Sequence, residues 1–293
     1  MRILISDAFD ASLPGRLKKF GEVTDDKSQV ANADVVLIRS KTKCTKEYID
    51  GAPHLKLIIR GGVGIDNIDV AYAKEKGIEV RNTPAASSIA VAELAMALMI
   101  ALPNHLIKGH NSMVQGQWLK KECKRGELYQ KTLGLIGLGR IGIETAIRAK
   151  AFGMKVIAYD VVRSDQDVAE YVDNLDDLLA AADYISLHLP LTDKTNGMIN
   201  KSLIAKMKDG VRIVNTGRGK TVNEADVAEA LKSGKIAGYG NDVWYSDPPE
   251  STPLTDAPNV VLLPHIGAST DENLLRIGDI IVEIITEFSK KKK

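Results

Sequence analysis

The glycine-rich stretch at residues 131–142 constrains the fold of this chain more than any other feature. Residues 133–136 are apolar and read as a buried strand, and residues 143–152 carry helical apolar spacing. Between these segments, three glycines follow the spacing G-x-G-x-x-G: Gly137, Gly139 and Gly142. In that order they permit a tight turn, a close approach of the backbone to a pyrophosphate, and close packing of the helix on the strand. The stretch therefore predicts a strand–turn–helix unit that binds a dinucleotide.

A second predicted strand, residues 155–160, ends in an acid. Asp160 follows Gly142 at close to the roughly 20-residue spacing expected for a carboxylate that binds the ribose hydroxyls of NAD. We therefore expect NAD as the cofactor, while Arg163 nearby leaves some use of NADP open. The alternative interpretation is a glycine-rich turn in an unrelated α/β protein.

Composition narrows the class of protein. A chain of 293 residues, 44% apolar and 26% charged, has the profile of an ordinary globular protein of about two domains. Its net charge of +1 provides no field to attract nucleic acid or a membrane, and the longest apolar run, 94–102, is too short to span a bilayer. The lysines at 290–293 read as a solvated tail. Two cysteines without metal-ligand spacing indicate no metal site and favour a cytoplasmic location.

The first 83 residues predict a small α/β unit, because short Val-, Ile- and Leu-rich strands alternate with helical segments. Pro84 favours an extended residue before it, so a lobe boundary is expected near here. The apolar segment 87–102 then predicts a helix with so little polar surface that both lobes or a second subunit must cover it. This favours a homodimer. The continuation from this helix to Gln130 reads as polar and irregular.

From Lys131 onwards the pattern predicts a doubly wound parallel sheet of about six strands, followed by a last helix at 271–288. Ligands of such sheets bind beyond the carboxyl ends of the strands. The predicted strand ends carry polar, ionisable or glycine-rich segments: 137–142, Asp160, His188-Leu189-Pro190, Thr216-Gly217-Arg218, Asp242 and His265. Their convergence on one edge is more typical of a site than of structural residues.

Three of the residues late in the chain have the chemistry that hydride transfer to or from nicotinamide requires. His265 is a candidate acid/base, Arg218 a candidate cation for a substrate carboxylate, and Asp247 a candidate carboxylate to orient the imidazole. Glycines flank Arg218, which we interpret as letting its guanidinium approach a ligand without obstruction by neighbouring side chains. A lone histidine is often structural, and an acid before two prolines is often only a turn former.

At these residues the sequence resembles the D-2-hydroxyacid dehydrogenase family over nearly the whole chain. The matching stretches are 37–42, 60–67, 82–84, 92–94, 134–142, 215–219 and 264–270. The resemblance implies an α/β fold of two lobes whose last helix returns to the first: residues 1–83 with 271–293 as the substrate-binding domain, and 84–270 as the NAD-binding Rossmann domain. It also implies closure of the lobes over the substrate, hinged near 83–84 and 269–271.

The resemblance assigns roles residue by residue. The catalytic arginine and histidine match Arg218 and His265, and the acid, normally Glu in the family, falls on Asp247, whose side chain is one methylene shorter. The expected cofactor-binding residues are Gly137, Gly139, Arg140, Ile141, Gly142, Asp160, His188, Leu189, Pro190, Thr216, Gly217, Arg218, Asp242, His265, Gly267 and Ala268. The expected substrate-binding residues are Arg39, Ser40, Arg60, Val63 and Gly64.

Substrate choice depends on two arginines of the first lobe. Arg39 and Arg60 resemble a pair found in members of the family that act on phosphoglycerate, and a guanidinium suits a phosphate because it binds bidentately. The expected substrate is therefore a phosphorylated 2-hydroxy acid, D-3-phosphoglycerate, oxidised at C2. The alternatives are an interlobe salt bridge for either arginine, glyoxylate or hydroxypyruvate reduction, formate oxidation, which the run 238–244 resembles, and a non-catalytic NAD-sensing interaction protein.

Overall fold

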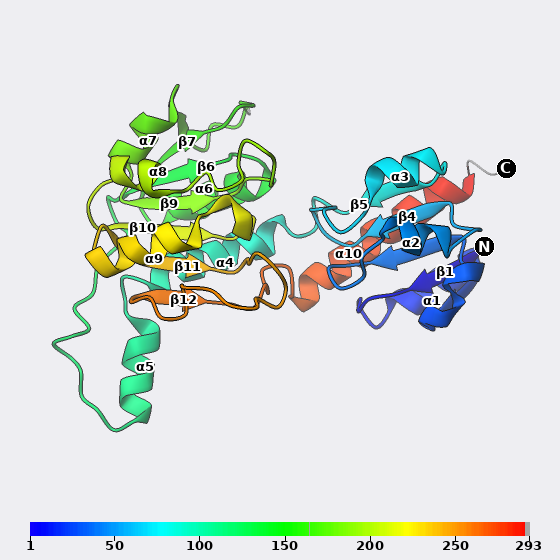
Figure 1. Cartoon of the computed structure of the whole chain (residues 1–293), viewed down its shortest axis with the longest axis horizontal. Coiled ribbons are helices and arrows are strands. Elements are labelled where there is room, and N and C mark those ends of the chain that lie inside the picture. The colour runs from blue at the N-terminus through cyan, green and yellow to red at the C-terminus, as the bar shows by residue number, and fades with distance from the viewer. Residues whose placement is uncertain (164, 291–293) are drawn as a thin grey trace. The chain divides into compact units, whose positions relative to one another are not determined.

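The glycine-rich stretch lies in a sheet of seven parallel strands ordered β12-β11-β10-β9-β6-β7-β8 (Figure 1). The structure, a computed structural model, describes residues 1–163 and 165–290. The strands are β6 (Thr132–Ile136), β7 (Lys155–Tyr159), β8 (Glu170–Tyr171), β9 (Tyr184–Leu187), β10 (Val211–Asn215), β11 (Ile236–Asn241) and β12 (Val260–Leu262). The chain adds strands on both sides of β6, so the sheet is doubly wound as predicted. We expected about six strands, and the extra one, β8, is too short to leave a sequence pattern.

Helices cover both faces of this sheet. They are α4 (Ser88–Ala101), α6 (Arg140–Ala151), α7 (Leu175–Ala181), α8 (Lys201–Lys206) and α9 (Glu224–Ser233). A further helix, α5 (Leu106–Val114), lies between α4 and β6 in the chain. One apolar core joins the sheet to α4 and α6, and a second joins its other face to α7, α8 and α9. The buried strand residues divide between these two cores, which is why the strands read as continuous apolar runs.

Helix α4 finds its cover within its own unit. Ala95, Met96, Leu98 and Met99 are buried in the core that α4 shares with α6 and the sheet. Much of the apolar surface expected to need cover from both lobes or a second subunit is thus covered within unit 2. The face with Ile89, Glu93 and Ala97 remains exposed. The apolar composition of α4 reflects its position between α6 and the strands.

The segment expected to be polar and irregular contains helix α5, so that expectation is also wrong. In Figure 1, α5 and the loop after it project away from the sheet and helices of their own unit. Several large apolar side chains of this arm are exposed: Leu106, Ile107, Met113, Val114, Trp118 and Tyr129. Among the described residues no single helix is long and apolar enough to cross a membrane; α4 and α5 pass that test only as a pair bent by 65°.

The N-terminal residues form a second parallel sheet of five strands ordered β2-β1-β3-β4-β5. These are β1 (Arg2–Ile5), β2 (Glu22–Thr24), β3 (Val35–Ile38), β4 (Leu57–Arg60) and β5 (Glu79–Asn82). Helices α1 (Leu13–Leu17) and α10 (Asp271–Lys290) pack on one face, and α2 (Lys46–Asp50) and α3 (Val70–Glu75) on the other. Strand β2 went unpredicted, because its three residues carry little apolar surface.

The chain divides into two compact units, Met1–Ser87 with Ala268–Lys293 (unit 1) and Ser88–Gly267 (unit 2). These bounds differ by a few residues from the expected 83/84 and 270/271. The reason is local packing. Ala86 is buried in the core of unit 1, and the Ala268 carbonyl accepts hydrogen bonds from Arg39 and Asn273 of the same unit. The last lysines, 291–293, lie outside the described residues.

Candidate active site

The strand register of unit 2 aligns the expected site residues along one edge. Ile136 of β6 pairs with Tyr159 of β7 and Leu187 of β9, Leu187 pairs with Asn215 of β10, and Asn215 pairs with Asn241 of β11. The residues directly after these strand ends are Gly137, Asp160, His188, Thr216 and Asp242. Segments separated by up to a hundred residues therefore meet at the carboxyl edge, where ligands of such sheets bind.

The glycine turn has the geometry that a pyrophosphate requires. Gly137 has φ +96°, and a Cβ there would lie 2.7 Å from the His188 carbonyl oxygen. A Cβ at Gly142 would lie 2.4 Å from the Gly137 oxygen, so only glycine lets the helix pack this closely. Around Gly139 there is open space, and Arg140 and Ile141 open helix α6 directly after it. The exposed N-terminus of α6 thus fits a dinucleotide phosphate.

Asp160 is fastened to that turn. Its carboxylate accepts a hydrogen bond from the Leu138 backbone N–H at 2.7 Å and from the Val162 N–H at 3.0 Å. This fixes the acid beside the phosphate-binding turn, where the ribose of a bound NAD is expected. Arg163 forms an ion pair with Asp173 at 2.5 Å, so it is engaged in a contact of its own.

Two buried polar atoms at this edge have no hydrogen-bond partner among the described residues: His188 Nδ1 and Thr216 Oγ1. The other ring nitrogen of His188 lies 3.0 Å from Ser186 Oγ. Buried polar groups are rarely left unpaired, so both atoms point to a ligand that supplies the missing partner. They follow β9 and β10, next to the glycine turn, and so fit the cofactor assigned to this edge.

Burial lowers the pKa of His188 to about 4. The unfolded chain takes up a proton on this side chain near pH 6.5, whereas the folded protein does so only near pH 4. Stability from this group is thus present above pH 6.5 and is lost as the pH falls towards 4. We expect an additional loss of about 2 kcal/mol in the unfolding free energy between about pH 7 and pH 5. Urea denaturation at both pH values should show a smaller drop for His188→Asn. The exposed His54→Asn is the matched control, and an unchanged drop in the His188 variant would contradict this.

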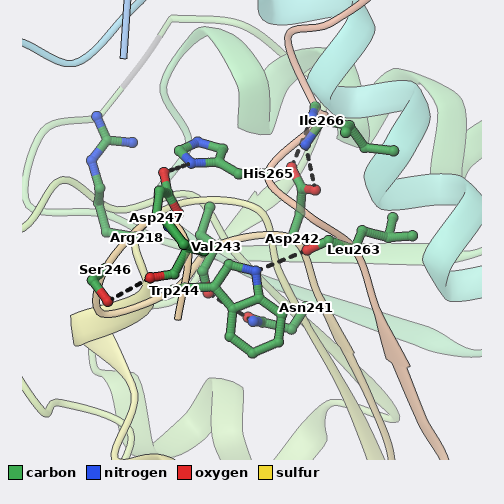
Figure 2. Close-up of polar contacts among 12 residues, drawn as sticks. Arg218, Asn241, Asp242, Val243, Trp244, Ser246, Asp247, Leu263, His265 and Ile266 are labelled. Carbon is green, nitrogen blue, oxygen red and sulfur yellow. Dashed lines mark hydrogen bonds and ion pairs between the residues drawn. The ribbon is translucent and has the colours of Figure 1, made fainter. Parts of the chain in front are cut away.

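The imidazole of His265 faces the carboxylate of Asp247 (Figure 2). Their Nδ1 and Oδ2 atoms are 2.5 Å apart, although eighteen positions separate the two residues in the chain. Both side chains remain partly exposed, at 38% and 43%. Asp247 therefore reaches the ring despite being shorter than the glutamate common in the resembling family. With Nδ1 held by the carboxylate, Nε2 is the nitrogen left for proton exchange with a substrate.

Asp242 supports the turn that presents His265. Its Oδ1 accepts from the Ile266 N–H and its Oδ2 from the Gly267 N–H, both at 2.8 Å. Burial raises the pKa of Asp242, and these two donors oppose that effect. His265 has the left-handed φ of +57°, which is rare outside glycine. The two hydrogen bonds hold the backbone directly after it and so stabilise this unusual conformation.

Arg218 follows β10 in a loop whose glycines are required by packing. A Cβ at Gly217 would lie 3.2 Å from the Leu187 and Leu189 oxygens, and one at Gly219 would lie 2.3 Å from the Trp244 backbone. Close contact with neighbouring backbone therefore gives these glycines a packing role besides the ligand access expected of them. The Arg218 guanidinium donates to the Gly217 carbonyl at 2.8 Å, and the loop lies against the segment that leads to Asp247.

In unit 1, Arg39 and Arg60 follow or end neighbouring strands, because Ile38 of β3 pairs with Arg60 of β4. Asp7 accepts hydrogen bonds from the backbone N–H groups of Arg39 at 2.6 Å and Thr42 at 3.2 Å, which fixes the loop that includes Ser40. Within residues 1–163 and 165–290, the Arg39 guanidinium donates to two carbonyls, Ala8 at 3.5 Å and Ala268 at 3.2 Å. Burial lowers the pKa of Arg39, and Asp7 opposes this.

The loop with Val63 and Gly64 is fastened by the segment before the first crossing between units. Asn82 donates to the Val63 carbonyl at 2.5 Å, and the buried Thr83 hydroxyl accepts from the Gly62 N–H at 2.8 Å. Gly62 has φ +144°, which favours glycine. The loop backbone is thus held in a defined shape for the substrate role expected of it.

Several supporting residues were missed by sequence reasoning. Asp7, Asn82, Thr83 and Trp244 hold the loops that carry the expected site residues. Asp7 follows the first predicted strand, so its position at a strand end was a usable signal. The others act through backbone contacts that leave no residue pattern. Among the described residues, no group of three or more His, Cys, Asp or Glu side chains is placed to hold a metal ion.

Comparison with known families identifies the class of protein. The family model described as "D-isomer specific 2-hydroxyacid dehydrogenase, NAD binding domain" matches residues 96–267. The chain belongs to this family and is an NAD-dependent oxidoreductase. The match contains the glycine turn, Asp160, Arg218, Asp247 and His265.

Individual relatives differ in the substrate their names give. A hydroxypyruvate reductase of Thermotoga maritima is 51% identical, over 87% of this chain and 85% of that protein. A D-3-phosphoglycerate dehydrogenase of Methanocaldococcus jannaschii is 44% identical over 97% of this chain, which spans only 57% of that protein. The structure of D-lactate dehydrogenase from Aquifex aeolicus, complexed with NAD and lactic acid, is 33% identical with a TM-score of 0.87, covering 99% of this chain and 96% of that one.

Proposed function

We propose that this protein oxidises D-3-phosphoglycerate at C2 to 3-phosphohydroxypyruvate with NAD, the reaction that supplies serine biosynthesis. The observation that carries the choice of substrate is the pair of guanidinium groups at neighbouring strand ends of unit 1. The Arg39 guanidinium is partly buried, and among the described residues it has carbonyl partners and no ion pair. Such a cation suits an anion with several oxygens, and phosphate is the group that distinguishes this substrate.

The proposed mechanism assigns one task to each residue. When bound, NAD supplies the hydride acceptor. Arg218 binds the substrate carboxylate and polarises the oxygen at C2. His265 Nε2 takes the hydroxyl proton as the hydride leaves C2, and Asp247 stabilises the imidazolium that forms. Backbone N–H groups of the loop at Val63 and Gly64 contribute donors to the carboxylate. Asp160 and the N-terminus of α6 hold the ribose and the pyrophosphate of the cofactor.

A second candidate is reduction of hydroxypyruvate, the unphosphorylated analogue. It is favoured by the relative of that name, because the two chains match over most of both lengths. The two candidates share the chemistry at C2 and differ only at C3, so the same catalytic residues serve both. The reaction at C2 therefore does not distinguish the two candidates. Only a preference for or against the phosphorylated substrate can distinguish them.

Absorbance of NADH with a panel of acids tests both candidates. Under the proposal, kcat/KM for 3-phosphohydroxypyruvate should exceed that for hydroxypyruvate by roughly ten-fold or more, because a guanidinium–phosphate contact contributes roughly 1.5–3 kcal/mol. A preference for hydroxypyruvate would transfer the assignment to the second candidate. Absence of turnover with the whole panel, in a chain that binds NADH, would support an NAD-sensing role instead.

We also propose that the protein is a homodimer joined through the arm of α5 and its following loop, rather than through α4. The arm exposes several large apolar side chains close together, and exposed apolar patches of this kind mark interaction sites. A second copy of the chain offers the same apolar surface.

Val114→Asp should therefore convert a dimer into a monomer in sedimentation velocity. Leu275→Asp, at an exposed apolar residue of α10 outside the arm, is the control and should leave the mass unchanged. A monomeric wild-type protein would contradict the proposal.

A further inference from the structure

The loop that carries Asp247 is tied to the segment that carries His265. Trp244 Nε1 donates a hydrogen bond to the Leu263 carbonyl at 2.9 Å, and Leu263 stands two positions before His265 (Figure 2). A second tie lies on the other side of the loop. The Tyr245 hydroxyl donates to the Val222 carbonyl at 2.7 Å and accepts from the Glu224 N–H, where α9 begins, at 3.4 Å.

These ties matter because the Asp247 side chain makes few contacts of its own. Its loop is also held by Asn241 Nδ2, which donates to the Val243 carbonyl at 2.7 Å, and by Ser246 Oγ, which donates to the Pro248 carbonyl at 2.9 Å. Among the described residues, the Asp247 side chain has His265 as its one hydrogen-bond partner. Both side chains are too exposed for burial to fix them. An aspartate also reaches less far than a glutamate, so its backbone must stand closer to the imidazole. The distance between the two loops therefore determines whether the pair forms.

Trp244 contacts the third catalytic segment as well. Its backbone lies against Gly219, where a Cβ would approach to 2.3 Å, so it borders the loop of Arg218. Its ring packs on the apolar core beneath α7, α8 and α9. One residue thus joins the loops of Arg218 and Asp247 to the segment of His265, and only its indole N–H makes the directional contact to that segment.

We propose that Trp244 is a positioning residue whose indole N–H sets the spacing between Asp247 and His265, so that an aspartate can do what the family's longer glutamate does. This rests on the proposed function, in which His265 exchanges the substrate proton. Tyr245 limits movement of the same loop away from the imidazole. A purely packing role for Trp244 would require only its aromatic ring. The substitution Trp244→Phe therefore separates the two roles, because it keeps a ring and removes the N–H donor.

Trp244→Phe keeps the ring and removes the donor. We expect kcat to fall roughly 3- to 10-fold, as for loss of one neutral hydrogen bond, while the Kd for NADH stays unchanged. The ascending limb of the pH profile of kcat/KM should move, because a carboxylate beside an imidazole stabilises its protonated form. Adding Asp247→Glu to this variant should restore most of kcat, since the longer side chain does not need the tie. Tyr72→Phe is the matched control, because it keeps a ring and removes only the hydroxyl that donates to Asp50 in unit 1.

Two outcomes would overturn the proposal. One is a Trp244→Phe enzyme with the kcat and pH profile of the wild type. The other is a loss of kcat that Asp247→Glu does not restore and that accompanies a lower Tm, which would mark a packing role. Failure of the proposed function looks different. The wild-type protein would then lack turnover with 3-phosphohydroxypyruvate, or His265→Ala would remain active, whatever the result for Trp244→Phe.

Discussion

Replacing His265 by alanine is expected to lower kcat by about 10³-fold, the range found for loss of a general acid/base. The reason is geometric. The imidazole is held by Asp247 through Nδ1, and its backbone is held by Asp242 through the next two N–H groups. The other histidine of this sheet edge, His188, is a poor substitute, because burial lowers its pKa to about 4. Arg218→Ala is expected to lower kcat at least as much, because the substitution removes both the partner of the substrate carboxylate and the positive charge near the C2 oxygen.

The measurement is steady-state turnover followed at the NADH absorbance band, with NADH binding followed by fluorescence. Both variants should still bind NADH, with a Kd that changes far less than kcat, because the glycine turn and Asp160 remain. Arg218→Lys should recover only part of the loss, since an ammonium keeps the charge and not the planar fork. His54→Ala and Lys220→Ala, both exposed, are the matched controls. Near-normal turnover in either His265→Ala or Arg218→Ala would remove the proposed mechanism.

Replacing Arg39 or Arg60 by alanine is expected to raise KM for 3-phosphoglycerate by roughly 10- to 100-fold, as for loss of a hydrogen bond to a charged group. The same substitutions should leave KM for hydroxypyruvate within about two-fold, because that molecule has no phosphate to lose. The split between the two substrates is the informative result. It separates a phosphate-binding role from a structural one, which would affect both alike.

Arg81→Ala is the control for this experiment. Arg81 belongs to unit 1 like the two test residues, and it is ion-paired with Glu79 and Glu287. It should leave both KM values unchanged, since its partners lie on the protein itself. Equal increases for both substrates in Arg39→Ala or Arg60→Ala would contradict the phosphate assignment and favour hydroxypyruvate as the natural substrate.

Much of the fold could be predicted from the sequence because the signals are local. Strand β7 lies within the predicted strand 155–160, and helix α10 begins at residue 271, where its apolar periodicity predicts. Helix α5 could not be predicted this way. The apolar side chains of α5 are exposed in the single chain and do not pack on the core of its unit. The segment therefore lacked the pattern of a core-packed helix and was predicted to be irregular.

The candidate site divides in the same manner. The glycine turn, Asp160, Arg218 and His265 were predicted because each stands where a strand ends, and parallel strands bring their ends to one edge. The contact between Asp247 and His265 was only a hypothesis, because an aspartate falls where the family has a glutamate. Whether the Asp247 carboxylate reaches the imidazole depends on where its loop lies, and no sequence pattern predicts the position of that loop.

By itself, the sequence determined the fold class, the dinucleotide turn and the residue types available for proton and anion chemistry. These follow from periodicities and spacings within one segment of chain. The tertiary structure alone decided the rest. It shows that α4 packs largely within its own unit and that neighbouring backbone lies against the glycines beside Arg218. It also shows that Trp244 links the loop of Asp247 to the segment of His265. Such contacts join residues distant in sequence, and their distances depend on how the strands pair and the helices pack.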